Sequence, residues 1–126
     1  MFRNDDVEIS VLKGRVIKDI DVNKDKDVIT FNMEDGHIYK MLHFQNCCED
    51  VRIEDIEGDL GNLVGSPIVS AEESSNEGNK GNDNYGTETW TFYKFSTIKG
   101  YVTIRWYGES NGYYSEEVDF VDVTNQ

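Results

Sequence analysis

The sequence predicts a mainly β protein, built as a twisted antiparallel sheet or a small β-sandwich with one short helix near residues 59–64. Apolar residues alternate with polar ones along most of the chain, which is the pattern of strands that bury one face. Turn-forming Gly, Asn and Asp residues separate these runs, and Pro67, the only proline, falls at one of the breaks. A chain of 126 residues suffices for one domain with its own core, so we expect a single domain over residues 1–126.

The N-terminal third, residues 1–44, is expected to form a β-meander of runs rich in β-branched side chains. The first two runs are separated at Gly14, so they are either two short strands or one strand with a bulge. The last two are separated by Glu34-Asp35-Gly36, and Asp-Gly is among the stronger hairpin signals. The predicted runs cover residues 7–12, 16–22, 28–33 and 37–44.

The middle of the chain loses the strict alternation. A strand is still expected at residues 51–56, but the following DLGNLV run resembles a single helical turn. Asp59 is its predicted cap and Gly65 its predicted stop. A further strand is expected at residues 68–74. Residues 75–86 are rich in Gly and Asn with no apolar period, so they predict a mobile loop.

Residues 88–123 are expected to form a C-terminal three-stranded segment. Its last two strands, between Gly100 and Val121, are predicted to pair as a hairpin across the turn at residues 108–112. Along the first of them, period-two alternation assigns alternate residues to opposite faces. The predicted core face carries Val102, Ile104 and Trp106, and the opposite face carries Tyr101, Thr103, Arg105 and Tyr107. In the preceding strand, the aromatic residues expected to join the core are Trp90, Phe92 and Phe95.

The charge of the chain limits its partners. It has 25 acidic and 12 basic residues, a net charge of −13 spread over the whole sequence. Such a surface repels DNA, RNA and anionic membranes, whereas one or two arginines can still hold a small anion because salt screens more distant charges. No apolar run approaches the ~20 residues of a membrane span and the N-terminal residues lack a signal-peptide core, so we expect a cytoplasmic protein.

Two constellations invite a catalytic or metal-binding interpretation. His43 lies near Cys47-Cys48, but no second ligand pair accompanies them, so a structural turn with a buried thiol is favoured over zinc or a Cys-His nucleophile. Adjacent cysteines cannot link distant segments, and a reducing compartment is expected. The second constellation is an acidic cluster whose spacing does not match a calcium loop, so it predicts a solvated face. Its members are Glu49, Asp50, Glu54, Asp55, Glu57 and Asp59. The pairs Glu72-Glu73 and Glu116-Glu117 are likewise expected on exposed strands. Neither metal, cofactor nor catalytic residue is expected.

Arg52 and Arg105 are unlike the other basic residues because each lies inside a strand-like apolar run. Each could pair with a nearby carboxylate, which is the simpler interpretation. The density of aromatic residues around Arg105 suggests instead a face on which a base stacks and a pyrophosphate is held by guanidinium groups.

Several blocks of the sequence together resemble the phage-encoded Thoeris anti-defence proteins of the first described type. The resemblance covers roughly residues 39–121. The blocks that carry it are CCE at 47–49, IEDI at 53–56, GDL at 58–60, Gly65 with Pro67-Ile68, AEE at 71–73, TWTFY at 89–93, KGYVTIRWYG at 99–108 and SNGYYSE at 110–116.

This resemblance implies a non-enzymatic sponge that binds a TIR-produced cyclic ADP-ribose isomer, such as glycocyclic ADP-ribose, and withholds it from its effector. It implies a homo-oligomer with ligand pockets at subunit interfaces, and cyclic oligonucleotides as possible further ligands. An arginine on the penultimate core strand, here Arg105, would contact the ligand, and an aromatic residue of the variable loop, here Tyr85, would stack on adenine. Two alternatives stay open: a hydrolase of the same signal, and an acidic inhibitor of a host defence protein. The candidate ligand-binding residues are Arg105, Arg52, Tyr85, Trp90, Tyr107 and Asn111.

Overall fold

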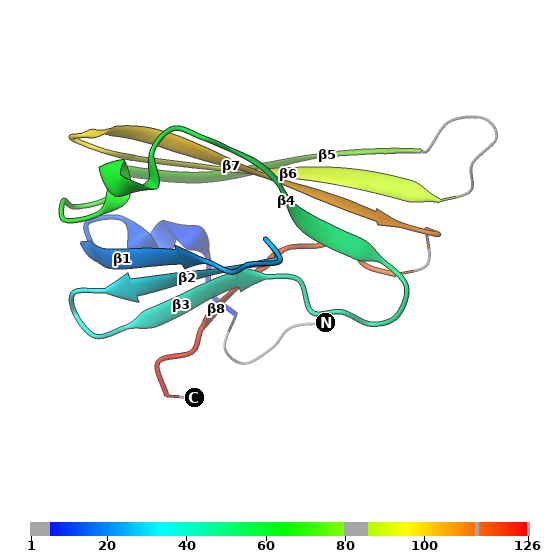
Figure 1. Ribbon diagram of the computed structural model, residues 1–126, viewed down its shortest axis with the longest axis horizontal. Coiled ribbons are helices and arrows are strands. Elements are labelled where there is room, and N and C mark those ends of the chain that lie inside the picture. Colours follow the sequence, from blue (N-terminus) through cyan, green and yellow to red (C-terminus); the bar gives the residue numbers. More distant parts are fainter. Residues whose placement is uncertain (1–5, 80–85, 113, 126) are drawn as a thin grey trace.

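The protein is a small β-sandwich, which confirms the predicted fold class. The computed structural model describes residues 6–79, 86–112 and 114–125. Within them, two antiparallel four-stranded sheets have the strand orders β1-β2-β3-β8 and β4-β7-β6-β5. Figure 1 shows the sheets as two layers, with the far ends of β5, β6 and β7 reaching past the shorter strands. The strands are β1 (Ile17–Val22), β2 (Val28–Met33), β3 (Ile38–Leu42), β4 (Asp50–Glu57), β5 (Ser70–Asn79), β6 (Thr87–Thr97), β7 (Gly100–Ser110) and β8 (Asp119–Asp122).

The first sheet contains the predicted meander, with one correction. β2 and β3 pair across the turn at Gly36, whose φ is +94°. The strand predicted at residues 7–12 is wrong, because a 3-10 helix, η1 (Ile9–Leu12), occupies that place. Ile9 and Leu12 are its buried residues, and a spacing of three puts both on one side of a helical turn. β-branched composition alone had favoured a strand there.

The middle of the chain contains the predicted helical turn, η2 (Leu60–Leu63). The Asp59 side chain caps it by accepting a hydrogen bond of 2.8 Å from the backbone N–H of Gly61. The loop predicted at residues 75–86 begins too early, because β5 continues to Asn79 and pairs with β6 as far as Thr87. Backbone hydrogen bonds to a neighbouring strand need no apolar side chains, so composition could not reveal this extension. Residues 80–85 lie outside the described part of the chain.

The core lies between the two sheets, and the predicted alternation of β7 is confirmed. Trp106 is fully buried, and its indole N–H donates a hydrogen bond of 3.2 Å to the Met41 sulfur on β3. On β6 the buried positions are Thr91, Tyr93, Phe95 and Thr97. Phe95 therefore joins the core as predicted. Trp90 and Phe92 do not, because they alternate with these residues and face outward.

The hairpin predicted between Gly100 and Val121 is wrong. After β7 ends at Ser110 the chain crosses to the other sheet, where β8 pairs with β3 instead of β7. On the way Glu116 becomes buried and accepts hydrogen bonds from the hydroxyls of Thr89 (2.7 Å) and Ser110 (2.5 Å). The segment before β8 is thereby tied to the sheet it leaves, and Glu116 is not on an exposed strand.

Alanine substitutions at two glycines test how closely the end of β4 approaches β7. Gly58 and Gly36 have similar positive φ values, +97° and +94°. A Cβ on Gly58 would lie 2.6 Å from the Tyr101 carbonyl oxygen, whereas a Cβ on Gly36 would meet nothing within 4 Å. We expect Gly36→Ala to lower the free energy of unfolding by about 1 kcal/mol through backbone strain, and Gly58→Ala to lower it by roughly 2 kcal/mol more. Urea unfolding of both variants measures the difference, and equal losses would contradict the close approach.

Candidate functional site

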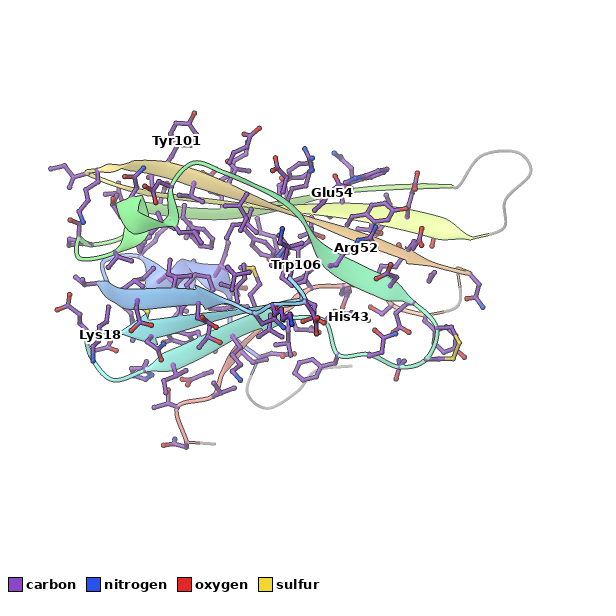
Figure 2. All side chains as sticks on the ribbon, viewed as in Figure 1. Lys18, His43, Arg52, Glu54, Tyr101 and Trp106 are labelled. Atoms are coloured by element: carbon purple, nitrogen blue, oxygen red, sulfur yellow. A yellow bond between two sulfur atoms is a disulfide. The ribbon has the colours of Figure 1, made fainter. Side chains whose placement is uncertain are left out.

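The face of the β4-β7-β6-β5 sheet that points away from the other sheet, called the outer face below, gathers most of the predicted site residues. Cross-strand partners share a face of a sheet. Tyr107 on β7 is paired with Arg52 on β4 and with Trp90 on β6. One row nearer the β6–β7 turn, Arg105 is paired with Phe92. Figure 2 shows Trp106 between the two sheets and Tyr101 on the outside. The side chains of β7 therefore alternate between the core and the outer face.

Arg52, Tyr107 and Trp90 form a contiguous row, called the aromatic row below. The Arg52 guanidinium carbon lies 5.3 Å from the centre of the Tyr107 ring, a cation–π distance. The Trp90 and Tyr107 ring centres are also 5.3 Å apart, with the planes tilted by 55°. The single hydrogen of the Tyr107 hydroxyl is shared between the carboxylates of Glu88 (2.9 Å) and Glu109 (3.0 Å). Burial and then these two carboxylates raise the pKa of Tyr107, so its hydroxyl stays protonated at neutral pH.

Arg105 is held by two consecutive carboxylates. Its Nε lies 2.7 Å from Glu54 Oε1, and its Nη2 lies 4.0 Å from Asp55 Oδ2. A β-bulge causes this arrangement: the pairing of β4 with β7 shifts register between Ile53 and Asp55, which leaves Glu54 and Asp55 both exposed. The contact with Glu54 is an ion pair and not a hydrogen bond, because the buried Nε–H has no acceptor in suitable geometry.

Ion pairing, the simpler of the two interpretations of these arginines, is thus what the structure contains. Arg52 pairs with Asp50 on its own strand, as Arg105 pairs with Glu54. The side chains of Arg52 and Arg105 are 47% and 37% exposed, so an incoming anion can reach both.

Two predicted site residues are not part of these rows. Asn111 is exposed and follows the end of β7, beyond the row that pairs Glu109 with Asp50. Tyr85 lies outside the described residues. For Glu54 and Asp55 the sequence predicts only solvated charges, and it does not single out Glu88, because a bulge and a cross-strand register are not visible in it.

A second polar region lies on the inner face of the same sheet, where the long strands pass the shorter ones (Figure 1). The segment 114–118 encloses there a cleft of about 900 Å³, called the acidic cleft below. Three inward positions of β6 carry threonine where the core would need apolar residues, which is a signal that sequence reasoning missed. The lining residues that carry charge or hydroxyl groups are Glu73, Ser75, Glu77, Thr87, Thr89, Thr91, Tyr114, Ser115, Glu116 and Glu117.

Carboxylates around the acidic cleft repel one another. Burial, followed by the charges of Glu117, Asp119 and Glu8, raises the pKa of Glu73, while a hydrogen bond with Tyr93 opposes the rise. Burial and the charges of Asp6 and Glu117 likewise raise the pKa of Asp119. Ionised carboxylates here therefore cost stability at neutral pH.

The loop before β4 corrects two predictions. Cys47 and Cys48 are exposed and joined to each other by a disulfide, so the expected buried thiol is wrong. Glu49 is only 3% exposed and does not belong to a solvated acidic face. Burial favours its neutral form, but hydrogen bonds from the backbone of Cys47 and Asn46 and from His43 outweigh burial and lower the pKa of Glu49 to about 2. Across the described residues, no group of three or more His, Cys, Asp or Glu side chains is arranged to hold a metal ion.

These features define a small β-sandwich with an arginine- and aromatic-bearing face and an acidic cleft. The chain belongs to a family described as a domain of unknown function (DUF7448), whose model matches residues 10–120. No curated protein and no solved structure shows significant similarity to it. None of the helices in the described ranges is long and apolar enough to cross a membrane.

Substitutions of two adjacent glutamates on β5, Glu72 and Glu73, test whether ionised carboxylates in the acidic cleft lower stability. Because the pKa of Glu73 is raised, its contribution to stability is present below its ordinary value of 4.5 and is lost as the pH rises through the raised pKa. Glu73→Gln should therefore increase the free energy of unfolding at pH 7, by a few tenths of a kcal/mol because solvent screens this side chain. The increase should vanish near pH 3, where the native glutamate is also neutral.

Glu72→Gln is the matched control, because Glu72 lies on the outer face opposite Lys94. Loss of that opposite-charge pair should lower stability slightly at pH 7. Urea unfolding at both pH values measures the two variants. Effects of the same sign at positions 72 and 73 would contradict the described charge distribution.

Proposed function

We propose that this protein is a non-enzymatic anti-defence protein that binds a TIR-produced cyclic ADP-ribose signal, such as glycocyclic ADP-ribose, and withholds it from its effector. The specific ligand comes from the sequence resemblance to the phage Thoeris anti-defence proteins. The outer face is the proposed contact surface, with the phage-infected cell's cytoplasm as its compartment.

The aromatic row is the observation that supports this proposal most directly. It holds a guanidinium group over a tyrosine ring with a tryptophan ring beside it, next to a second arginine one row away. Adenine has two flat faces that stack on aromatic rings, and a pyrophosphate accepts paired hydrogen bonds from guanidinium groups. A cyclic ADP-ribose isomer carries both groups, so its chemistry matches the side chains of this face.

An anionic ligand would have to exchange with carboxylates. On binding, phosphate oxygens would take the positions that Glu54 and Asp50 hold beside Arg105 and Arg52. The buried Nε–H of Arg105 lacks an acceptor and could gain one from a phosphate oxygen. The remaining carboxylates of the outer face would repel the ligand, which favours a ligand whose rings contribute much of the binding energy.

Tight sequestration also requires burial of the ligand. A nanomolar affinity corresponds to about −12 kcal/mol, which one stacked base and two charge-assisted contacts do not reach. A ligand on the open outer face of one chain would leave one side in water. A homo-oligomer that closes a second subunit over this face would supply the missing contacts, as the resemblance implies, and separate sites could hold cyclic oligonucleotides.

A retention experiment tests the proposed function. The protein is incubated with the product of an activated TIR enzyme, filtered to remove free nucleotide, and heat-denatured, and both fractions are assayed for the signal. We expect the signal to be depleted from the filtrate and recovered unmodified from the denatured protein. Signal that stays in the filtrate would contradict the proposal.

The same experiment separates the two alternative functions. A hydrolase would leave degraded nucleotide in either fraction. An acidic inhibitor of a host defence protein would leave the signal intact and unbound while still blocking defence. Mass spectrometry of nucleotides that co-purify with the protein identifies the ligand directly.

Arg105→Ala tests the residue expected to contact phosphate. Because a hydrogen bond to a charged group contributes roughly 1.5–3 kcal/mol, the substitution should weaken ligand binding by about 10- to 100-fold. Its thermal midpoint without ligand should change little, since surface ion pairs contribute about 0–1 kcal/mol. Isothermal titration and thermal unfolding measure the two effects.

Arg15→Ala is the matched control, because Arg15 is similarly exposed and pairs at 2.9 Å with Asp35, in the turn between β2 and β3 and so away from the outer face. It should bind the ligand as the unaltered protein does. A loss of folding stability in Arg105→Ala as large as its loss of binding would assign Arg105 a purely structural role.

A further inference from the structure

His43 connects three segments that are distant in the sequence. It directly follows β3, and its side chain is 5% exposed. Its Nε2 lies 2.9 Å from Glu49 Oε2, in the loop before β4. Its Nδ1 lies 2.6 Å from the backbone carbonyl oxygen of Glu117, in the segment before β8. Both ring nitrogens are therefore engaged within the protein.

Both partners of this ring are hydrogen-bond acceptors. A backbone carbonyl oxygen has no proton to donate. The Glu49 carboxylate has none either when it is ionised, and its surroundings hold it in that form. Its Oε2 also accepts from the Asn46 N–H (2.9 Å) and its Oε1 from the Cys47 N–H (2.8 Å). These donors contribute to the pKa of about 2 for Glu49.

A neutral imidazole has one N–H donor and one lone-pair nitrogen. In this position it would turn its lone pair toward either the carboxylate or the carbonyl oxygen, at a distance that requires a hydrogen between them. A doubly protonated ring satisfies both contacts. We infer that His43 carries two protons in the folded protein and acts as a pH-sensitive latch between the end of β3, the loop before β4 and the segment before β8.

The charges around the latch favour a cation. Glu49 faces the ring directly from the loop before β4. From β8, Asp119 interacts with it electrostatically, and Asp119 is itself close to the charges of Glu117 and Asp6. The cation thus lies among carboxylates that repel one another. Loss of one proton from His43 removes this charge and breaks one of the two contacts, which loosens the segments that they hold.

Nitrogen-15 NMR of the labelled full chain tests the protonation state directly. An imidazolium gives two similar ¹⁵N shifts, whereas a neutral tautomer gives two widely separated ones. We expect imidazolium signals for His43 at about pH 6 to 7 with the fold intact. Neutral-tautomer signals for His43 in the folded protein at about pH 6 would overturn the inference.

The pH dependence of stability tests the latch. The chain has only two histidines, His37 and His43, so few groups titrate between about pH 6 and 8. A group that is protonated in the fold contributes stability at low pH and loses it as the pH rises. The folding equilibrium constant of the unaltered protein should therefore fall as the pH rises through the deprotonation of His43, by up to about tenfold per pH unit, the limit for one proton.

His43→Gln should remove most of this dependence, and His37→Gln, at the half-exposed histidine beside Asp122, should keep it. The N-terminal amine titrates equally in all three proteins and cancels in the comparison. The same pH slope in His43→Gln and in the unaltered protein would overturn the latch. If His43→Gln does not fold, the NMR measurement on the unaltered protein still decides.

Discussion

The packing of Trp106 between the two sheets is the contact on which both faces of β7 depend. Its side chain is fully buried, and its N–H reaches the Met41 sulfur across the sandwich. Because side chains alternate along a strand, burying Trp106 and Ile104 obliges Arg105 and Tyr107 to face outward. The candidate site is therefore a geometric consequence of the core.

Acidic residues outnumber basic ones in this protein, and their carboxylates lie in three kinds of environment. On the outer face they neutralise guanidinium groups, as Glu54 does beside Arg105. At Glu49 and Glu116 they are buried and supplied with hydrogen-bond donors: backbone N–H groups and a histidine in one case, threonine and serine hydroxyls in the other. In the acidic cleft, burial and then the charges of neighbouring carboxylates raise the pKa of Glu73. A net charge of −13 thus says little about any one local field.

Local patterns predicted the fold class and several elements because they depend on near neighbours in the chain. The hairpin at Gly36, the helical turn capped by Asp59 and the two faces of β7 follow from turn chemistry and period-two alternation. Where an element depends on a distant partner, prediction failed. The end of β5 is a strand because β6 lies beside it, and β8 joins the other sheet because β3 offers an open edge. The adjacent cysteines and Glu49 were also misjudged, although their partners are near in the chain, because the conformation of the loop before β4 follows no periodic pattern.

The sequence by itself determined that alternate residues of β7 point to opposite faces, and so that Arg105 and Trp106 are separated by the sheet. Only the tertiary structure decided which residues contact each of them. The bulge in β4 brings Glu54 and Asp55 to Arg105, and cross-strand register places Arg52 over Tyr107 beside Trp90. The crossing of the last segment between sheets brings the Glu117 carbonyl to His43, 74 residues away. Alternation is a property of one strand, whereas register, bulges and crossings depend on how strands meet, and no local pattern records that.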